Sequence, residues 1–328
     1  MAKGLVTLIG GSGFIGRYAA RTLVEAGWRV RVACRRPNVA QDVRVAGPPG
    51  WVDLVQANVR NTDSLKRAME GADAVVNLVG ILFESGKQTF SSAQLDGART
   101  AAEVARESGA ERFVQISAIG ADAQSSVDYA RTKGAAEAAV AEAFPGAVIL
   151  RPSIVFGPED QFFNRFAQMA RFAPALPAIG GGKTKFQPVY AGDVADAIVC
   201  AVTRDDVAGN TYELGGPGTY TFNALYDFIF ETIDRRRLKA PLPFFLAKAG
   251  GVVAGAVFRY VPPFSWGLFG APPLTGGQVD LLRKDNVVAS DALTLADLGV
   301  TELESIEAIV PTYLWRFRPY GEFHRGEV

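Results

Sequence analysis

The stretch Leu5–Gly16, LVTLIGGSGFIG, decides the fold of this 328-residue chain. It begins with a largely apolar run that predicts a buried strand and continues with the spacing of a helix. Glycines at the intervals found here let a backbone turn tightly, approach a pyrophosphate and pack a helix against a strand. They are Gly10, Gly13 and Gly16. The stretch predicts a dinucleotide-binding unit; the alternative is a glycine-rich turn without a ligand.

The rest of the first half alternates between short apolar runs and segments with helical spacing. The expected strands after the first, which spans 5–9, lie at 29–34, 51–58, 74–80, 112–117 and 147–153. Such alternation implies a parallel sheet that is covered by helices on both faces. We therefore predict an α/β fold, a Rossmann-type doubly wound parallel sheet.

The alternation breaks down after about Gly157, where prolines and glycines become frequent. Two later pieces, 187–202 and 209–216, still resemble parts of a sheet, so a smaller lobe is expected to interleave with the first domain. We predict a Rossmann domain over 1–157 with returning segments near 186–214, and a smaller C-terminal lobe over 158–185 and 215–328.

Composition excludes several classes of protein and site. Lysines plus arginines number 34 and so do aspartates plus glutamates, which is unlike the basic excess of nucleic-acid binders. Cys34 and Cys200 lie in apolar runs, which indicates a reducing compartment and no disulfide framework. The single histidine, His324, argues against histidine triads and zinc sites, and we expect no metal.

Targeting and membrane-spanning segments are not expected. The first strand begins at Leu5, so we expect no signal or transit peptide before it. No apolar run reaches the ~18 residues of a spanning helix. The nearest candidate, 244–258, is shorter and contains Lys248.

The end of the second expected strand bears on the choice of cofactor. NAD-binding proteins usually place an acidic residue there for the ribose hydroxyls. This chain reads VACRRP, with Cys34, Arg35 and Arg36 instead. Arginine suits a 2′-phosphate through charge-assisted hydrogen bonds, and Arg17 could add to them. We predict NADP(H) rather than NAD(H); the alternative is that these arginines are solvated loop charges.

A tyrosine and a lysine stand four residues apart in DYARTKGAAE, 128–137. On a helix Tyr129 and Lys133 share one face, where they can transfer a proton beside a nucleotide or only hold it. Ser117 ends the strand 112–117 at the carboxyl edge of the sheet, where ligands bind. Ser125 and Ser126 are alternatives to Ser117.

GGSGFIG, Ser117, YARTK and RPSIVFGPED together resemble the extended short-chain dehydrogenase/reductase superfamily. The resemblance implies that Tyr129 is the acid/base, that Lys133 binds ribose and lowers the tyrosine pKa, and that Ser117 polarises the substrate. Active members often carry an asparagine, part of a proton relay, where this chain has Gln94. Arg151 matches a superfamily position that organises the cleft rather than performing chemistry, as does the following proline.

The cofactor contacts expected here are Gly10, Gly13, Phe14, Ile15, Gly16, Arg35, Arg36, Asn58, Val79, Gly80, Tyr129, Lys133 and Pro152. Gly10–Gly16 and the arginines follow from the motif and the strand end, and the remaining positions follow from the resemblance.

A narrower resemblance involves the second half, 143–172 and 183–198, and two later pieces, 274–288 and 313–323. These segments resemble the nucleotide-binding accessory subunits of respiratory complex I, in their bacterial form. The resemblance implies tightly held NADPH, a role in assembly or stability with no reaction of its own, and complex I subunits as partners. It also implies a bacterial protein on the cytoplasmic face of the inner membrane.

Two other functions stay open. The first is an active NADP-dependent reductase, dehydrogenase or epimerase that uses Ser117, Tyr129 and Lys133 on an unknown substrate, such as a nucleotide-linked one. The second is a redox sensor whose affinity for partners differs between the two cofactor forms.

The lobe also offers a candidate docking surface, an arginine cluster at 235–237 beside the apolar segment 244–258. The arginines could contact phosphate headgroups while apolar side chains lie against lipid or a membrane subunit. Those side chains are Phe244, Phe245, Val252, Val253, Val257 and Phe258. In the alternative interpretation, the arginines cap the end of a helix at 222–234 and the apolar segment is lobe core.

Overall fold

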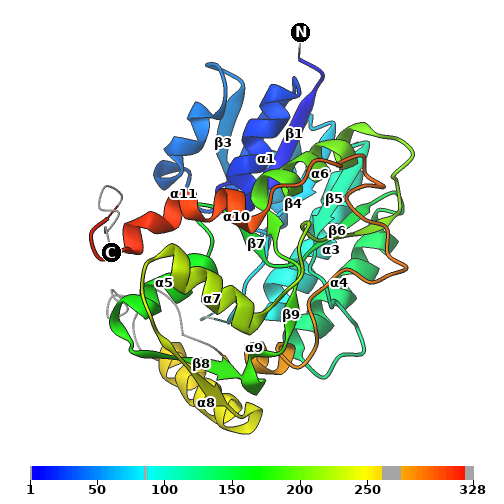
Figure 1. Cartoon of the computed structure of the whole chain (residues 1–328). Helices are drawn as coiled ribbons and strands as arrows, with labels where there is room; N and C mark the ends of the chain where they lie inside the picture. Colours follow the sequence, from blue (N-terminus) through cyan, green and yellow to red (C-terminus); the bar gives the residue numbers. More distant parts are fainter. Residues whose placement is uncertain (1, 85, 87, 261–274, 322–328) are drawn as a thin grey trace. The chain divides into compact units, whose positions relative to one another are not determined.

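The computed structural model describes residues 2–84, 86, 88–260 and 275–321, without the side chains of 253–260 (Figure 1). His324 and the side chains of Val253, Val257 and Phe258 therefore lie outside the described residues. The chain forms two compact units. The first is Met1–Pro152, Ala191–Gly215 and Val288–Leu303, and the second is Ser153–Tyr190, Gly216–Val287 and Glu304–Val328.

The first unit is built on a seven-stranded sheet in which every neighbouring pair is parallel. Its strands are β1 (Leu5–Ile9), β2 (Arg29–Cys34), β3 (Val52–Gln56), β4 (Ala74–Asn77), β5 (Arg112–Ile116), β6 (Val148–Pro152) and β11 (Thr211–Leu214). Their order is β11-β6-β5-β4-β1-β2-β3, so the order of succession reverses between β1 and β4. This confirms the predicted doubly wound α/β fold.

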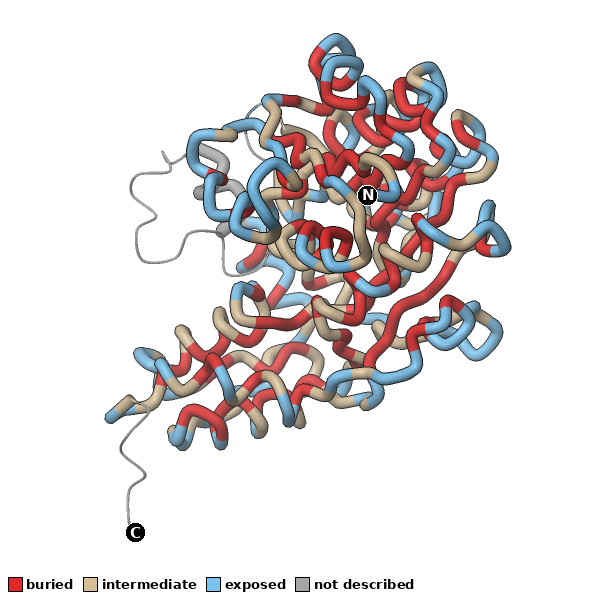
Figure 2. The backbone as a smooth tube through the Cα atoms, turned by 90° about the horizontal axis from the view of Figure 1, so that it is seen from above, coloured by how far each residue is buried: buried red, intermediate tan, exposed pale blue. Residues whose placement is uncertain are grey.

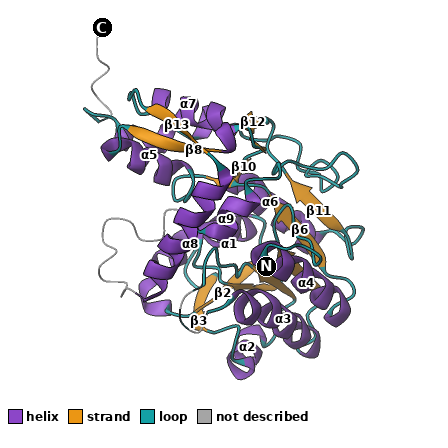
Figure 3. Ribbon diagram, turned by 90° about the horizontal axis from the view of Figure 1, so that it is seen from below, coloured by secondary structure: helices purple, strands orange, loops and turns teal. Residues whose placement is uncertain are grey.

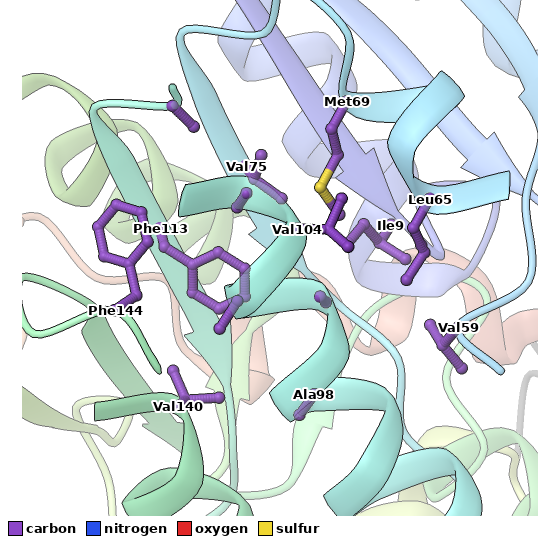
Figure 4. Close-up of a cluster of buried hydrophobic side chains, with 14 of the residues drawn as sticks. Ile9, Val59, Leu65, Met69, Val75, Ala98, Val104, Phe113, Val140 and Phe144 are labelled. Carbon is purple, nitrogen blue, oxygen red and sulfur yellow. The ribbon is translucent and has the colours of Figure 1, made fainter. Parts of the chain in front are cut away.

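Helices cover both faces of this sheet. They are α1 (Phe14–Glu25), α2 (Thr62–Met69), α3 (Asp96–Glu107), α4 (Asp128–Ala143) and α6 (Ala191–Thr203). Helices α2, α3 and α4 lie side by side, whereas α1 packs with α6 (Figure 3). In Figure 4, Phe113 of the sheet lies on the side of Val140 of α4, and Ile9 of the sheet lies near Leu65 of α2 and Val104 of α3. Figure 2 shows buried residues along the strands and the inner helix faces, as burial of apolar surface requires.

Several expected strands end earlier than the sequence suggested. β3 ends at Gln56 rather than at 58, β4 at Asn77 rather than at 80, and β5 at Ile116 rather than at 117. The chain leaves the sheet at these points to form loops, so Asn58, Gly80 and Ser117 lie just beyond the carboxyl ends of strands.

A charged network inside the first unit fixes helix α4 to the sheet. Arg151 on β6 donates from Nε and Nη2 to the two carboxylate oxygens of Glu137 on α4, at 3.0 and 2.6 Å. Its Nη1 lies 3.5 Å from Glu213 on β11, and Glu213 accepts from the backbone N–H of Ala289 at 2.9 Å. The hydrogen bond to Glu137 is the main cause of the raised pKa of Arg151. Arg151 thus organises the helix that carries Tyr129 and Lys133.

The same network joins a late segment to the sheet. Residues 288–303 group with the first unit, although the sequence-based division placed them in the lobe. Besides the Ala289 bond, the backbone N–H of Glu213 donates to Leu293 at 2.8 Å. The late segment contributes only backbone groups to these bonds, and backbone groups carry no sequence pattern.

The second unit contains short strands and helices around an aromatic core. Its strands are β7 (Val155–Phe156), β8 (Ala175–Ile179), β9 (Lys185–Phe186), β10 (Val189–Tyr190), β12 (Tyr220–Thr221) and β13 (Leu238–Leu242). They pair as β7 with β10, β9 with β12 and β8 with β13. The helices are α5 (Phe163–Phe172), α7 (Phe222–Thr232), α8 (Phe244–Tyr260), α9 (Gly276–Leu281), α10 (Ile306–Ile309) and α11 (Pro311–Leu314). Phe166, Phe222 and Tyr226 are buried together at its centre.

The motif ending at Asp160 has a structural role in this unit. The buried Asp160 accepts from the backbone N–H groups of Phe162 and Asn164, at 2.8 and 3.2 Å, at the start of α5. Tyr313 Oη donates to the other carboxylate oxygen. Burial raises the pKa of Asp160 and these hydrogen bonds oppose the rise. The acidic end of RPSIVFGPED therefore holds a helix start.

Among the described residues, none of the helices has the length and apolar character needed to cross a membrane. Helix α8 covers the apolar segment 244–258 named above. Phe244 is half-buried against the small cluster of Ile179, Ala247 and Val279, whereas Phe245 and Val252 are exposed. The described part of this segment is thus core on one side and exposed on the other.

Candidate functional site

The predicted cofactor residues gather along one edge of the sheet in the first unit. Gly10 follows β1, Arg35 follows β2, Asn58 follows β3, and Val79 and Gly80 follow β4. Ser117 follows β5, and Pro152 ends β6. Parallel sheets bind ligands at the carboxyl edge, where the strand order reverses. In this sheet that point lies between β1 and β4.

The glycine loop brings the start of α1 to this edge. Gly10 has a φ of +79°, and a Cβ there would lie 3.1 Å from Val79 Cγ2. At Gly16 a Cβ would lie 2.5 Å from the backbone of Gly11, so only glycine allows this approach of helix and loop. Gly13 caps the helix without a side chain, leaving the first-turn N–H groups to an added acceptor. These features fit the pyrophosphate of a dinucleotide.

The arginines at this edge fall into two kinds. Arg35 and Arg36 are exposed, and within the described residues their side chains form no hydrogen bond or ion pair. Arg17 instead pairs with Asp42 at 2.5 Å and donates to the Ser12 carbonyl at 3.3 Å. The guanidinium of Arg17 is thus already committed, whereas Arg35 and Arg36 remain available to a phosphate.

Lys133 is buried beneath this edge. Its Nζ donates to the Ile116 carbonyl at 3.1 Å, at the end of β5. A Cβ on Gly80 would lie 3.6 Å from this Nζ, so the loop after β4 passes beside it. Burial lowers the pKa of Lys133 to about 8, and Glu137 opposes the shift. One donor of the ammonium is used, which leaves others for ribose hydroxyls.

Tyr129 lies on the same face of α4 as Lys133. Its ring is half-buried and meets Phe90 edge-on, with centroids 5.9 Å apart. Burial raises the pKa of Tyr129 to about 12. The resemblance implied the opposite, a pKa lowered by Lys133. In this structure the loss of solvent outweighs any attraction to the ammonium, which itself bonds to a backbone carbonyl.

Ser117 carries a buried hydroxyl without a partner. Its Oγ has no hydrogen bond within the described residues, while its backbone N–H donates to Leu150 at 2.7 Å. A buried polar group of this kind calls for a ligand or another explanation. Of the alternatives, Ser125 accepts from the N–H of Val127 at 3.2 Å within a turn, and Ser126 is exposed. Ser117 is therefore the serine best placed to meet a bound group.

Gln94 is fixed by its neighbours. It is buried in the π-helical turn Ser91–Leu95, and its Nε2 donates to the Ile81 carbonyl at 2.7 Å. Thr132 Oγ1 lies 3.5 Å from Gln94 Oε1. Gln94 thus ties the loop after β4 to helix α4, and one of the two N–H groups of its amide donates to protein.

Sequence reasoning missed a buried polar pair at the switch point. Asn77 Nδ2 donates to Gln115 Oε1 at 2.9 Å, and Asn77 Oδ1 accepts from the N–H of Val79 at 3.2 Å. Gln115 Nε2 donates to the Ile116 carbonyl at 2.9 Å, the same carbonyl that Lys133 binds. The sequence did contain a signal for this pair, because Asn77 and Gln115 are polar residues within the otherwise largely apolar runs AVVN and RFVQI.

In the part of the chain that the structure describes, no group of histidine, cysteine or acidic side chains could hold a metal ion. Cys34 is buried and Cys200 is half-buried, and both are free thiols. Burial is the main cause of the raised pKa of Cys200.

A model of the NAD dependent epimerase/dehydratase family matches residues 6–215, which hold the glycine loop, Ser117, Tyr129 and Lys133. The chain belongs to this family. This confirms the expected membership of the extended short-chain dehydrogenases/reductases, whose members bind a nicotinamide nucleotide.

The chain is similar in sequence to mitochondrial complex I subunits. It is 36% identical over 299 residues to NADH dehydrogenase (ubiquinone) 1 alpha subcomplex subunit 9 of Arabidopsis thaliana, covering 90% of this chain and 74% of the relative. The subunit of that name in Mus musculus is 33% identical, covering 95% and 81%. The similarity to complex I subunits is thus confirmed.

The chain is also similar to an enzyme and to a solved structure. The ceramide reductase of Caulobacter vibrioides is 34% identical over 212 residues, 63% of each chain. The crystal structure of UDP-glucose 4-epimerase from Thermotoga maritima is similar in fold. The match covers 97% of the present chain and 100% of the epimerase chain. With a TM-score of 0.67 and 17% identity, this match supports the fold alone.

The pKa of Lys133 gives a test on the nucleotide-free protein. Because the folded-state pKa is about 8 against 10.5 for an ordinary lysine, the unfolded chain binds more protons between these values. Stability therefore rises with pH in this window, by up to about 1.4 kcal/mol per pH unit. Tyr129, whose pKa is raised from 10.0 to about 12, opposes this only above pH 10.

We expect the free energy of unfolding, measured by urea denaturation, to increase between pH 8 and pH 10 in the wild type. The Lys133→Met variant should not show this increase. The exposed Lys3→Met variant serves as the control and keeps the wild-type slope. Equal slopes in wild type and Lys133→Met would show that the buried lysine does not titrate there.

Proposed function

We propose that the protein is an NADP(H)-binding accessory subunit of bacterial respiratory complex I that holds its nucleotide tightly with little or no turnover. The observation that carries this proposal is the similarity to complex I subunits over 90% and 95% of the chain, which extends into the second unit. The similarity to the ceramide reductase covers 63%. We place the protein on the cytoplasmic face of the bacterial inner membrane.

The site supports firm binding of the nucleotide. The N–H groups of the first turn of α1 suit the pyrophosphate. Lys133 has donors left for ribose hydroxyls, and the buried Ser117 hydroxyl can bond to the nicotinamide side. When bound, NADPH supplies a transferable hydride. The residues of this chain bind it and orient it.

The same site gives reasons for slow turnover. A tyrosine with a pKa near 12 keeps its proton at neutral pH, so Tyr129 is a poor base for removing a proton from a substrate. Gln94, at the relay position, uses one of its two amide N–H groups to bond to the Ile81 carbonyl, which fixes the orientation of this side chain. Anchoring of the nucleotide is the role of Tyr129 and Lys133 that these contacts favour.

An active reductase is the second candidate function. It is favoured by the presence of Ser117, Tyr129 and Lys133 together and by the similarity to a ceramide reductase. A protonated tyrosine can still donate a proton in the direction of reduction. NADPH oxidation in the presence of a keto form of a ceramide-like lipid, lost in Tyr129→Phe, would favour this function over the accessory role.

The preference for NADP(H) rests on Arg35 and Arg36. We expect the double variant Arg35→Ser/Arg36→Ser to bind NADPH at least about 10-fold more weakly, because the loss of even one charge-assisted hydrogen bond costs about 1.5–3 kcal/mol. Binding of NADH should change little. Titration calorimetry measures both, and Arg29→Gln is the control, since Arg29 begins the same strand at its opposite end. Equal losses for both nucleotides would contradict the assignment.

The accessory role is tested by replacing the gene in its own organism. We expect Tyr129→Phe to leave NADH:quinone activity of the membranes at the wild-type level. Lys133→Met should lower NADPH retention at least about tenfold, since it removes a charged donor, and should lower the amount of complex I. A loss of activity in Tyr129→Phe with nucleotide still bound would move the assignment to the enzyme.

A further inference from the structure

Five arginines gather in the second unit where helices α5 and α7 and the turn Trp315–Phe317 end. They are Arg171, Arg235, Arg236, Arg237 and Arg318, and we call them the arginine patch. The lowered pKa of Arg235 has burial as its largest cause, followed by the charges of Arg237 and Arg171. The guanidinium groups are therefore close enough to repel one another.

Part of this patch has a structural explanation. Arg237 Nε donates to the Ala170 carbonyl of α5 at 2.7 Å, and Arg318 Nε donates to the Thr232 carbonyl of α7 at 2.9 Å. Arg235 Nε donates to Phe317 at 3.2 Å. Positive charge is favoured at helix C-termini. The end of α7 is thus capped by Arg318 and also by Arg235, whose backbone N–H donates to the Phe230 carbonyl at 2.9 Å. The side chain of Arg237 caps α5 instead of α7.

The patch nevertheless carries more positive charge than these ends require. Across the residues that the structure describes, none of its five arginines forms an ion pair with a carboxylate. Asp234 directly precedes Arg235 in the chain. Its charge raises the pKa of Arg235, but this is the smallest of the effects on that pKa. Arg171 and Arg236 are exposed and donate no side-chain hydrogen bond. The guanidinium groups of Arg171 and Arg236 therefore remain available to bind an anion.

Apolar side chains stand exposed within the same patch. Phe172 is 69% exposed beneath the guanidinium of Arg171, which lies 5.5 Å from its ring centroid. Leu238, next to Arg237, is 73% exposed. Its N–H donates to Pro174 at 3.1 Å, which brings it near the end of α5. Exposed apolar groups beside unpaired arginines suit a surface with phosphates outside and hydrocarbon beneath.

We propose that the arginine patch binds the phosphates of anionic phospholipids at a membrane surface, with Phe172 and Leu238 entering the headgroup region. An acidic protein segment would satisfy the arginines but would leave these two side chains without an apolar partner. The inference deepens the proposed function by naming the surface that the second unit meets, and it rests on that function only in placing the protein beside a membrane.

Vesicle co-sedimentation of the full chain tests the inference. We expect binding to phosphatidylcholine vesicles that contain phosphatidylglycerol, weaker binding at high salt and none to phosphatidylcholine alone. The formal net charge is zero, so a preference for anionic vesicles must come from a local patch. The Arg171→Gln/Arg236→Gln variant should bind about 30-fold more weakly, since each arginine contributes about 1 kcal/mol near such a surface.

A matched control changes two exposed arginines of the first unit, Arg67→Gln/Arg99→Gln, and should bind like wild type. Phe172→Ser/Leu238→Ser should weaken binding without removing its salt dependence. Equal binding to neutral and anionic vesicles, or a patch variant that binds like wild type, would overturn the inference.

NADPH binding and co-purification with complex I are measured on the same variants. If the wild-type protein binds anionic vesicles but neither retains NADPH nor co-purifies with complex I, the proposed function is overturned and the lipid inference stands. A patch variant that loses complex I subunits while its vesicle binding is unchanged would assign the patch to an acidic protein partner and overturn the lipid inference alone.

Discussion

The close approach of helix α1 to the loop after β1 is the constraint on which the site depends. With 2.5 Å between the Gly11 backbone and any Cβ at Gly16, only glycine permits it. The approach places the helix N-terminus at the carboxyl edge of the sheet, where a Cβ at Gly10 would lie 3.1 Å from Val79 Cγ2 after β4. The reversal of strand order between β1 and β4 opens this edge to a ligand. The arginines after β2 and the lysine that bonds to the end of β5 lie at this same edge.

Burial decides what Tyr129 and Lys133 can do. Arg151 and Glu137 fix α4 against the sheet, and this holds both side chains under the edge. Burial raises the pKa of the tyrosine and lowers that of the lysine, because loss of solvent disfavours the charged form of each. At neutral pH the tyrosine is protonated and the lysine, with a pKa of about 8, is still mainly an ammonium, so both side chains can donate to ribose hydroxyls. Transfer of a proton away from a substrate would need the phenolate, which this environment disfavours.

Much of the first unit could be predicted from the sequence because apolar runs and glycine spacing are local signals. β1 and β2 begin and end where their apolar runs do. Contacts between distant residues carry no such signal. The bond of Lys133 to Ile116, the pair of Asn77 and Gln115, and the unpartnered Ser117 hydroxyl arise only when strands meet. The raised pKa of Tyr129 likewise follows from packing, and a motif cannot show it.

Native purification of the tagged protein from mildly solubilised membranes of its own organism tests the account most directly, with nucleotide and partner subunits quantified in the same eluate. The account predicts one NADP(H) per chain, together with complex I subunits in stoichiometric amounts. A nucleotide-free or freely exchanging protein that elutes without complex I subunits would contradict it.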